Sequence, residues 1–520
     1  MWFLRIKYIE IYFYKNFIST PVVYKKMDQT KQQQLSSPVE LKKINDITWE
    51  LPQSYKEGMR VPARIIANEE LIKAMDIGVF NQVTNVATLP GIQKYAYCMP
   101  DGHWGYGFPI GGVAAFDPEQ GGVISPGGIG FDINCGMRLI TTNLTAAEVK
   151  PKIHELVDAL YKAVPAGVGC KGFVKVTKEE FKEVMIHGAQ WCLKNGYAWK
   201  SDVENIESQG KIPQADPSKV SDKAIKRGFD QLGTLGSGNH YLEIQEVRKG
   251  NIFDTEAAKT MGITGPGQIV IMVHCGSRGF GHQIGTDYLR VFLDVMPKYG
   301  IKILDNELAC APFNSPEGQD YYKAMACAAN MAFANRQVIT HQIRKVFSQI
   351  FSKTAEEMEM NLVYDVAHNI AKLEKHMING KEKEVLVHRK GATRAFGPKR
   401  AKDLPAKYAK IGQPVILGGS METGSYLLLG TDGADETFSS TAHGAGRTMS
   451  RTKAIQLVQG EKLHKDMEKR GIYVHAVTMK GLAEEAGKAY KDIDVVVDTL
   501  EKAGITKKVV ALKPIGNVKG

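Results

Sequence analysis

The sequence lacks several features that would define its class at once. Its seven cysteines are scattered over 520 residues without regular spacing, so they form no disulfide framework and favour a reducing compartment. No apolar run reaches the roughly 18 residues that a membrane span needs. There is also no internal repeat, no Walker A lysine motif and no dinucleotide-binding fingerprint after a predicted strand. We therefore expect a cytoplasmic or nuclear protein with no membrane partner.

The composition is that of a folded chain with a positive charge. Hydrophobic residues make up 43% of the sequence and the formal net charge is +11, which favours a polyanionic partner such as nucleic acid without requiring one. The sequence turns globular from about residue 44, and its length and composition leave one large catalytic domain with insertions as likely as two or three modules. Residues 1–43 are expected to be an N-terminal extension, disordered or targeting, with Met27 as a candidate alternative start.

Periodicity predicts where several elements lie. Residues 59–75 read as a short strand and then a helix with Asn68 as its N-cap, and residues 319–351 read as one long helix with a core-facing stripe of Met and Ala. Residues 268–273 and 361–369 read as strands that deliver histidines at their ends. Residues 194–222 are polar and irregular, which predicts a surface insertion.

A glycine-rich stretch, residues 127–138, places one carboxylate and one thiol close together. It reads Gly-Gly-Ile-Gly-Phe-Asp-Ile-Asn-Cys-Gly-Met-Arg and contains Asp132 and Cys135. Glycine lets the backbone approach a ligand closely. A carboxylate and a thiolate are both metal ligands, and a thiolate can bridge two ions. An Asp-x-x-Cys pair alone is more often a turn beside a buried cysteine, so the metal hypothesis needs further ligands.

Three histidines supply those ligands. His240, His274 and His368 each follow a β-like run or a glycine turn, and such positions can converge at the open end of a sheet. Imidazole, carboxylate and thiolate together suit zinc, manganese, iron or cobalt. Five protein ligands exceed the needs of one tetrahedral ion. We therefore predict two ions bridged by Cys135, an arrangement that suits phosphoryl chemistry.

His443 has a different setting. It lies in the run His-Gly-Ala-Gly-Arg, residues 443–447, which we expect to open a helix that continues to about Arg470. Free N–H groups at a helix N-terminus attract phosphate, and a histidine aimed at that phosphate can act as a nucleophile. The residues alone give this role no preference over an N-cap or a structural histidine.

Two glycine-rich clusters and a basic tract complete the candidates. Residues 418–421, 425 and 444–446 are small and rich in donors, as a nucleotide base or phosphate requires. The basic tract suits contact with an RNA backbone, or else forms a solvated face. Its members are Arg389, Lys390, Arg394, Lys399, Arg400, Lys402, Lys407 and Lys410.

Taken in order, these motifs resemble those of the RtcB family of RNA-splicing ligases, in a eukaryote-like form. The similarity covers roughly residues 44–520. It rests on Phe-Asp-Ile-Asn-Cys-Gly at Asp132, Gly-Ser-Gly-Asn-His at His240, His-Cys-Gly-Ser-Arg-Gly at His274, Asp-Val-Ala-His-Asn at His368, His-Arg-Lys-Gly-Ala-Thr-Arg at His388 and His-Gly-Ala-Gly-Arg at His443.

The resemblance implies a single catalytic domain over residues 44–520, with a mixed α/β fold, a glycine-rich two-metal site at strand ends and no Rossmann or OB nucleotide module. It implies an enzyme that joins RNA 2′,3′-cyclic-phosphate or 3′-phosphate ends to 5′-hydroxyl ends, with GTP as co-substrate and two Mn²⁺ ions as cofactors. One ion is then held at Asp132, Cys135 and His240, and the other at Cys135, His274 and His368. His443 is implied to carry GMP covalently.

The resemblance also implies a guanylate site and partners. The matching guanylate positions are Asn239, His240, Tyr241, Leu242, Glu243, His368, Asn369, Gly418, Gly419, Ser420, Met421, Ser425, His443, Gly444, Ala445, Gly446 and Lys519. The implied substrates are tRNA exon halves, with mRNA splicing or RNA repair as further uses. The implied protein partners are archease and a DEAD-box helicase in a tRNA ligase complex.

Two features bear on these expectations. Glu422 stands where the family usually has glycine, and a carboxylate near a guanylate phosphate would repel it unless it points away. The same metal ligands would also serve a two-metal phosphohydrolase or nuclease, which needs no covalent nucleotide on His443. A non-catalytic RNA-binding scaffold is a third reading, disfavoured because it has little use for a thiolate and histidine cluster.

Overall fold

The computed structural model describes residues 41–520, and the structural statements below concern these residues. Within them, residues 42–520 form one structural unit. The extension expected over residues 1–43 lies outside the described residues, apart from its last three positions. None of the described helices combines the length and the hydropathy that a bilayer crossing requires.

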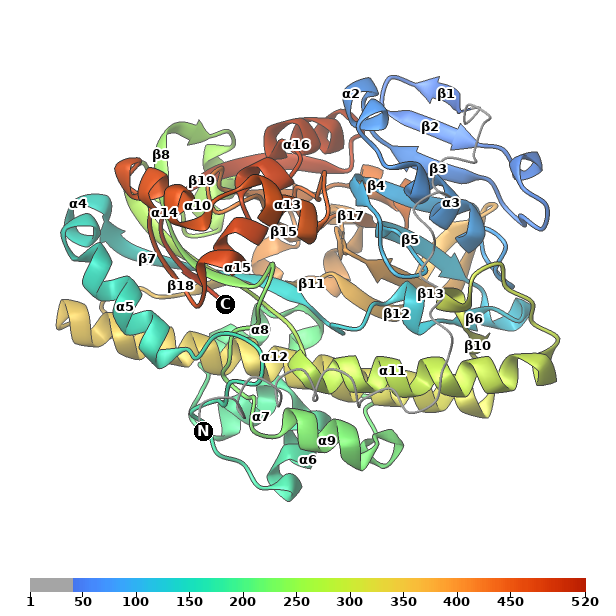
Figure 1. Cartoon of the computed structure of the whole chain (residues 1–520), viewed down its shortest axis with the longest axis horizontal. Coiled ribbons are helices and arrows are strands. Elements are labelled where there is room, and N and C mark those ends of the chain that lie inside the picture. Colours follow the sequence, from blue (N-terminus) through green and yellow to red (C-terminus); the bar gives the residue numbers. More distant parts are fainter. Residues whose placement is uncertain (1–40) are drawn as a thin grey trace, which may run out of the picture. The chain divides into compact units, whose positions relative to one another are not determined.

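Two large sheets carry the fold (Figure 1). The seven-stranded sheet has the order β1 (Lys42–Asn45), β2 (Thr48–Leu51), β3 (Ala63–Ile66), β4 (Ala96–His103), β5 (Ile110–Phe116), β13 (Lys381–Lys390) and β12 (Asn369–Ile378). The eight-stranded sheet has the order β11 (Leu362–Ala367), β7 (Gly136–Thr145), β9 (Gln268–Cys275), β8 (Tyr241–Ile252), β19 (Thr506–Lys519), β16 (Ser425–Gly430) and β15 (Pro414–Gly418), with β18 (Tyr473–Ala476) beside β19.

Two short pairs of strands complete the β structure. They are β6 (Val123–Ile124) with β10 (Ala311–Pro312), and β14 (Ala392–Arg394) with β17 (Ser440–Ala442). Within the named strands, only the β3–β4 and β18–β19 pairs are parallel. Mostly antiparallel sheets differ from the doubly wound parallel sheet of a Rossmann fold. The mixed α/β class expected from the sequence is confirmed.

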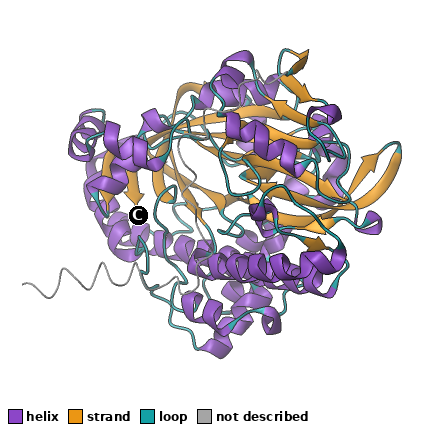
Figure 2. Cartoon of the chain, turned by 45° about the vertical axis from the view of Figure 1, so that its right-hand side comes forward, coloured by secondary structure: helices purple, strands orange, loops and turns teal. Residues whose placement is uncertain are grey.

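Helices flank these sheets (Figure 2). Their bounds are α2 (Glu69–Lys73), α3 (Ile77–Val86), α4 (Ala146–Val149), α5 (Ile153–Ala163), α6 (Lys178–His187), α7 (Ala189–Lys194), α8 (Lys200–Glu204), α9 (Asp222–Gly228), α10 (Thr255–Thr260), α11 (Arg278–Val295), α12 (Pro316–Phe351), α13 (Arg451–Leu457), α14 (Gly460–Lys469), α15 (Met479–Glu484) and α16 (Ile493–Lys502). The two longest, α11 and α12, run side by side along one side of the sheets (Figures 1 and 2).

Several local predictions are confirmed. Strand β3 is followed by helix α2, whose N-cap Asn68 accepts a hydrogen bond from the Leu71 backbone. The long helix is α12, and its Met and Ala side chains are buried as core. Strands β9 and β11 occupy the two segments that were expected to deliver histidines. These elements could be predicted because one hydrophobic pattern, helical or strand-like, continues through each segment.

Two local predictions are wrong. No helix begins at His443, because β17 precedes it, a loop follows, and α13 starts only at Arg451. The donors around His443 therefore do not come from a helix N-terminus. Residues 194–222 are not a surface insertion, since Asp202 and Glu207 are fully buried and Asp202 pairs with Arg344 of α12. Their polar composition misled the prediction because buried charges with partners look like solvated ones in sequence.

A buried charge cluster joins α12 to the ends of three strands. The Asp365 carboxylate on β11 pairs with Arg138 of β7 at 2.8 Å and with Arg336 of α12 at 2.7 Å, and none of the three side chains is exposed. Arg336 also donates to the backbone carbonyls of Asn134 and Cys275, at 2.7 and 2.9 Å. One guanidinium thus ties the helix to strand ends that carry the candidate metal ligands.

We predict that Asp365→Ala destabilises the protein strongly. The change leaves two buried guanidinium groups without their counter-charge, which costs about 3–5 kcal/mol. Thermal unfolding followed by circular dichroism should show Tm lowered by several degrees. The matched control is Asp46→Ala, which removes an ion pair whose carboxylate side chain is 96% exposed and should leave Tm unchanged. Equal Tm values for Asp365→Ala and the wild type would contradict this prediction.

Candidate metal and nucleotide site

The loop that precedes β7 has a fixed shape. Asn134 has a φ of 54°, a left-handed conformation that Asn adopts more readily than most residues, and the turn closes with a 3.0 Å bond from the Cys135 N–H to the Asp132 carbonyl. The Asn134 side chain donates to the Ala329 carbonyl of α12 at 2.7 Å. The His368 N–H donates to the Cys135 carbonyl at 2.8 Å. Asp132, Cys135 and His368 are therefore brought to one place by backbone bonds.

The five predicted metal ligands meet as a chain of contacts. Asp132 Oδ2 lies 2.8 Å from His240 Nε2, and that nitrogen lies 3.3 Å from Cys135 Sγ. Cys135 Sγ lies 3.2 Å from His274 Nε2, which in turn lies 3.1 Å from His368 Nε2. The donor atoms of Cys135, His240 and His274 all lie within 4.8 Å of one another. The thiol occupies the middle of the chain.

Glycines make this convergence possible. A Cβ on Gly276 would lie 2.3 Å from the Asp132 carboxylate, and a Cβ on Gly236 would lie 1.8 Å from Nδ1 of His240. Side chains at either position would push a ligand out of place, because real Cβ atoms do not approach neighbours so closely. Cys275, beside His274, is fully buried and its Sγ lies 4.0 Å from His240 Nδ1, behind the ligand atoms. Cys275 is therefore placed as a buried structural residue behind the cluster.

The electrostatics of the cluster are those of a cation site. Burial raises the pKa of the Cys135 thiol to about 12. Burial, together with the charges of neighbouring histidines, holds the pKa values of His274 and His368 well below the usual range. Burial alone would raise the pKa of Asp132, but the adjacent His240 holds it below its usual range. The Nε2 atoms of these two imidazoles face one another, and that of His274 also faces the buried sulfur.

A divalent metal ion fits this donor set. Neutral imidazole nitrogens, a carboxylate oxygen and a thiol sulfur are all ligands for transition metals, and a bound cation deprotonates a coordinating thiol outright. The Nε2 atoms of His274 and His368, 3.1 Å apart, are both placed where they could coordinate such an ion. The cluster can therefore hold a metal, with Asp132, Cys135, His240, His274 and His368 as its candidate ligands.

His443 lies at one end of the same chain of contacts. Its ring centroid is 4.9 Å from that of His368. Its Nδ1 lies 2.6 Å from Oδ2 of Asp101, and that same oxygen accepts the backbone N–H groups of His443 and Gly444 at 3.0 and 3.4 Å. The Asp101 carboxylate is fully buried. Burial opposes its ionised form, but His443 holds the pKa of Asp101 below its usual range.

Asp101 was missed by the sequence analysis. It sits in Pro-Asp-Gly-His, residues 100–103, inside β4, a stretch that looks like ordinary turn chemistry. The buried Lys491 ammonium donates to the carbonyls of Pro100 and Gly102 and so fixes this segment. The only local signal was an Asp-Gly-His run among glycines, which does not indicate a partner more than 300 residues away in the chain.

The glycine clusters predicted to bind a nucleotide do come together. Gly418 bridges to Gly444, and its carbonyl accepts the Ala445 N–H at 2.9 Å. A Cβ on Gly418 would lie 2.4 Å from the Tyr241 hydroxyl, so β8 packs closely against this junction. Gly446 has a φ of 75° and lies against the Asp101 carbonyl, where a Cβ would come within 2.1 Å. Glycine is therefore needed at both ends of the junction.

The charged guanylate positions lie on two neighbouring strands. Lys519 of β19 pairs in register with Tyr241 of β8, and Asn517 pairs with Glu243. Burial lowers the pKa of Lys519, whose Nζ lies 3.7 Å from Glu485 and 5.5 Å from the centre of the Tyr241 ring. Burial raises the pKa of Glu243 to about 7, although the nearby lysine opposes that rise.

The other guanylate positions predicted from the resemblance differ in their hydrogen bonds and packing. Ser425 accepts a bond from Gln245 at 3.1 Å. Asn369 is engaged structurally, since its amide donates to the Asp132 carbonyl and accepts from the Gly391 N–H. The side chain of Met421 packs in a core cluster, and Leu242 is buried in β8. Those that lie in turns beside the strands are Asn239, Gly419 and Ser420.

Glu422 points away from this junction. Its carboxylate accepts the Gly487 N–H at 2.7 Å and pairs with Arg470 at 2.6 Å. Both oxygens are therefore engaged on the side of α14 and the turn that follows α15. Glu422 therefore meets the condition stated above, that its carboxylate must point away if it is not to repel a guanylate phosphate.

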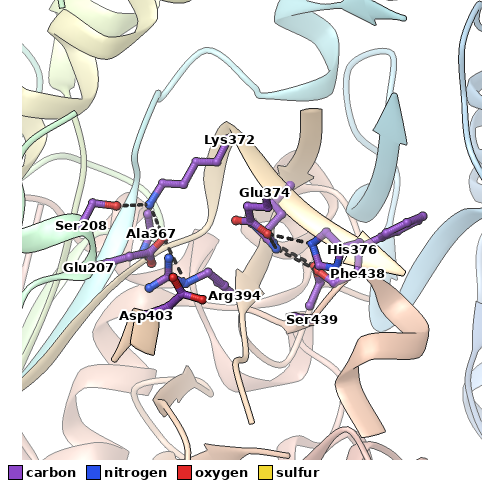
Figure 3. Close-up of polar contacts among 12 residues, drawn as sticks. Glu207, Ser208, Ala367, Lys372, Glu374, His376, Arg394, Asp403, Phe438 and Ser439 are labelled. Atoms are coloured by element: carbon purple, nitrogen blue, oxygen red, sulfur yellow. Dashed lines mark hydrogen bonds and ion pairs between the residues drawn. The ribbon is translucent and has the colours of Figure 1, made fainter. Parts of the chain in front are cut away.

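The first three members of the basic tract are buried in the interior. Arg389 is fully buried and pairs with Glu374 at 2.7 and 2.8 Å, and its guanidinium also donates to the Phe438 carbonyl. Arg394 and Lys390 are also buried, and Arg394 lies 3.8 Å from Glu207 (Figure 3). An RNA backbone cannot reach these side chains, so the reading of the whole tract as an RNA contact surface is wrong for these three residues.

Comparison with known proteins agrees with this geometry. The model of the family described as "tRNA-splicing ligase RtcB" matches residues 82–520. The chain belongs to the RtcB family. It is 54% identical to a tRNA-splicing ligase RtcB of Methanococcus maripaludis over 92% of this chain and 99% of the relative, and 52% identical to one of Thermococcus kodakarensis over 93% and 99%. It is also 47% identical to RNA-splicing ligase RtcB homolog 1 of Entamoeba dispar, over 91% and 89%.

Membership confirms the resemblance drawn from the motifs and the expectation of an RNA ligase. RtcB proteins with this name extend over nearly the whole described chain, so the metal cluster and the His443 junction both lie inside the matched region. The roles of the individual residues stay predictions.

We predict that Cys135→Ala removes metal binding. Within residues 41–520, the sulfur is the only candidate ligand atom that contacts the Nε2 atoms of both His240 and His274, so its loss separates the cluster into two halves. Metal content after incubation with Mn²⁺ and gel filtration should fall to background. The control is Cys310→Ala, which removes a buried thiol outside the cluster and should retain the wild-type metal content. Full metal occupancy in Cys135→Ala would contradict the prediction.

Proposed function

We propose that this protein joins RNA ends through a guanylylated His443, with GTP as co-substrate and two Mn²⁺ ions as cofactors. The observation that carries the proposal is the position of His443. It adjoins the metal cluster through His368, adjoins the glycine junction through Gly444, and has a buried carboxylate on Nδ1. A hydrolase with the same metal ligands has no need for a histidine in this position.

The Asp101 contact defines which nitrogen reacts. With Nδ1–H donating to the carboxylate, the lone pair of the neutral ring of His443 is on Nε2. In the proposed first step Nε2 attacks the α-phosphorus of GTP, a P–N bond forms, and pyrophosphate leaves. The Asp101 carboxylate balances the positive charge that the ring acquires. Metal ions bound at the cluster supply charge neutralisation for the phosphate oxygens.

The remaining steps transfer the guanylate to RNA. An RNA 3′-phosphate oxygen attacks the phosphorus on His443, the P–N bond breaks, and the RNA end becomes activated as a diphosphate with GMP. The 5′-hydroxyl of the second RNA then attacks the 3′-phosphorus, GMP leaves, and a phosphodiester remains. A 2′,3′-cyclic phosphate is first opened by water to the 3′-phosphate. Lys519 and the chain segments at residues 418–420 and 444–446 are the proposed guanylate contacts.

We propose tRNA exon halves as the substrate, in a cytoplasmic or nuclear setting, with mRNA splicing or RNA repair as further uses of the same reaction. Archease and a DEAD-box helicase are the proposed partners. The support is membership of a family described as tRNA-splicing ligase.

We predict that His443→Ala abolishes covalent labelling by α-labelled GTP. The protein is incubated with the nucleotide and Mn²⁺ and then run on a denaturing gel. The matched control is His475→Ala, because His475 also holds a carboxylate, Asp158, at 2.6 Å from Nδ1 but lies on β18. The control should be labelled like the wild type. Labelling of His443→Ala would place the guanylate on another residue and contradict the prediction. RNA hydrolysis without any labelled protein would favour the phosphohydrolase reading.

We predict that Asp101→Asn lowers the rate of GMP labelling by roughly 100- to 10,000-fold, because an amide can donate to Nδ1 and so favours the wrong tautomer. The metal content should stay at the wild-type level, since Asp101 contacts no ligand of the cluster directly. Pre-steady-state labelling with Mn²⁺ in excess measures the rate. A rate within twofold of the wild type would show that His443 does not depend on this carboxylate.

A further inference from the structure

The site has two distinct ends. The contacts run in the order Asp132, His240, Cys135, His274 and His368, and then reach His443. The guanylate junction lies at the His443 end, where Gly444 meets Gly418. When guanylate occupies that end, an RNA strand has to reach the reacting phosphate from the other side. Asp132 marks that other side.

Aromatic rings gather beside Asp132. The ring of Phe131, the preceding residue, stacks on the imidazole of His282 from α11, with centroids 6.0 Å apart and planes at 14°. It also makes an edge contact with Tyr106, with centroids 4.9 Å apart. His282 is exposed, and Phe131 and Tyr106 are half-buried. A Cβ on Gly285 would lie 2.9 Å from the Phe131 ring, so the ring rests directly on the backbone of α11.

Exposed cations stand next to these rings. Arg227 and Lys226 lie on α9, which packs against α11, and both are exposed. Arg227 donates to Gln283, the residue that follows His282, at 2.9 Å. Proteins that bind single-stranded nucleic acid combine rings that stack on bases with cations that follow the phosphate backbone. Phe131, His282 and Tyr106 supply the rings, and α9 supplies the cations.

We propose that Phe131, His282 and Tyr106 form a stacking platform for a base of the single-stranded RNA end that enters the site beside Asp132, with Arg227 on its phosphate backbone. The inference rests on the proposed function, because it takes RNA as the substrate. It adds a position for the RNA strand that is separate from the guanylate junction. Both substrates can then be bound at the same time, as the transfer from His443 to RNA requires.

The first test is RNA affinity. Fluorescence anisotropy with the full chain and Mn²⁺ compares two ten-nucleotide single-stranded RNAs, one ending in a 3′-phosphate and one beginning with a 5′-hydroxyl. Loss of one base–ring stack weakens binding by roughly 5- to 150-fold. His282→Ala should raise Kd by that factor for the RNA that uses the platform, and His282→Phe, which keeps a stacking ring, should stay within about twofold of the wild type.

The matched control is His154→Ala. His154 is also an exposed histidine stacked on an aromatic ring, with its centroid 3.9 Å from that of Tyr473, but it lies on α5. It should bind both RNAs like the wild type. Arg227→Ala should weaken binding of all sequences alike and reduce the slope of log K against log salt by about one.

The second test uses the wild-type protein and replaces the terminal nucleotides by abasic ones, one position at a time. One position should weaken binding as much as His282→Ala does, and His282→Ala should cause no further loss with that RNA. The proposal is overturned if His282→Ala leaves both Kd values within twofold of the wild type, as it would if the rings met a protein partner. It is equally overturned if no abasic position weakens binding.

These outcomes are separate from a failure of the proposed function. Labelling by GTP needs no RNA and is measured on the same wild-type sample, so an unlabelled His443 counts against the ligase mechanism alone. RNA binding that depends on His282 and on one base supports the platform whether or not the label forms.

Discussion

The Arg336 guanidinium is the interaction on which the rest of the site depends. It lies fully inside the protein, pairs with Asp365, and donates to the carbonyls of Asn134 and Cys275. A single planar group with five donors can hold two loops and a carboxylate at fixed angles, which a lysine could not do. The loop that carries Asp132 and Cys135 and the strand end that carries His274 are therefore both held against one long helix, α12. Ligand atoms about 3 Å apart require that rigidity, because metal sites tolerate little variation in geometry.

A second buried network supports the other end of the site (Figure 3). Glu207 accepts the N–H of Ala367, the residue before His368, and is paired with Lys372 of β12. On the same face of β12, Glu374 pairs with Arg389, whose guanidinium donates to Ser440 and so holds the strand that leads to His443. These buried charges cost desolvation energy, and each one is matched by a partner. Their arrangement fixes the position of His368, a candidate metal ligand, relative to His443, the proposed nucleophile.

The site therefore has three parts, the centre, the His443 end and the Asp132 end, which suit different ligands. The centre is buried and rich in ligand atoms, so it favours a cation. At the His443 end, glycines let the backbone approach a ligand closely, which suits the proposed nucleotide. The Asp132 end carries aromatic rings near exposed cations of α9, which suits the proposed RNA strand. In these two proposals, a nucleotide and an RNA end approach the same cluster from different ends.

The sequence by itself determined the family, the mixed α/β class and the elements with a single clear period, such as α12 and β9, and it named the candidate metal ligands that the fold brings together. Its motifs consist of residues that are neighbours in the chain, so they can be recognised without a structure. The tertiary structure alone decided which partners those residues meet. Asp101 reaches His443 across more than 300 residues, and Arg336 reaches Asn134 across about 200, and neither pairing leaves a local signal. The same holds for Arg389, Arg394 and Glu207, whose charges look solvated in sequence and are buried in the fold, because composition does not reveal whether a charge has a partner.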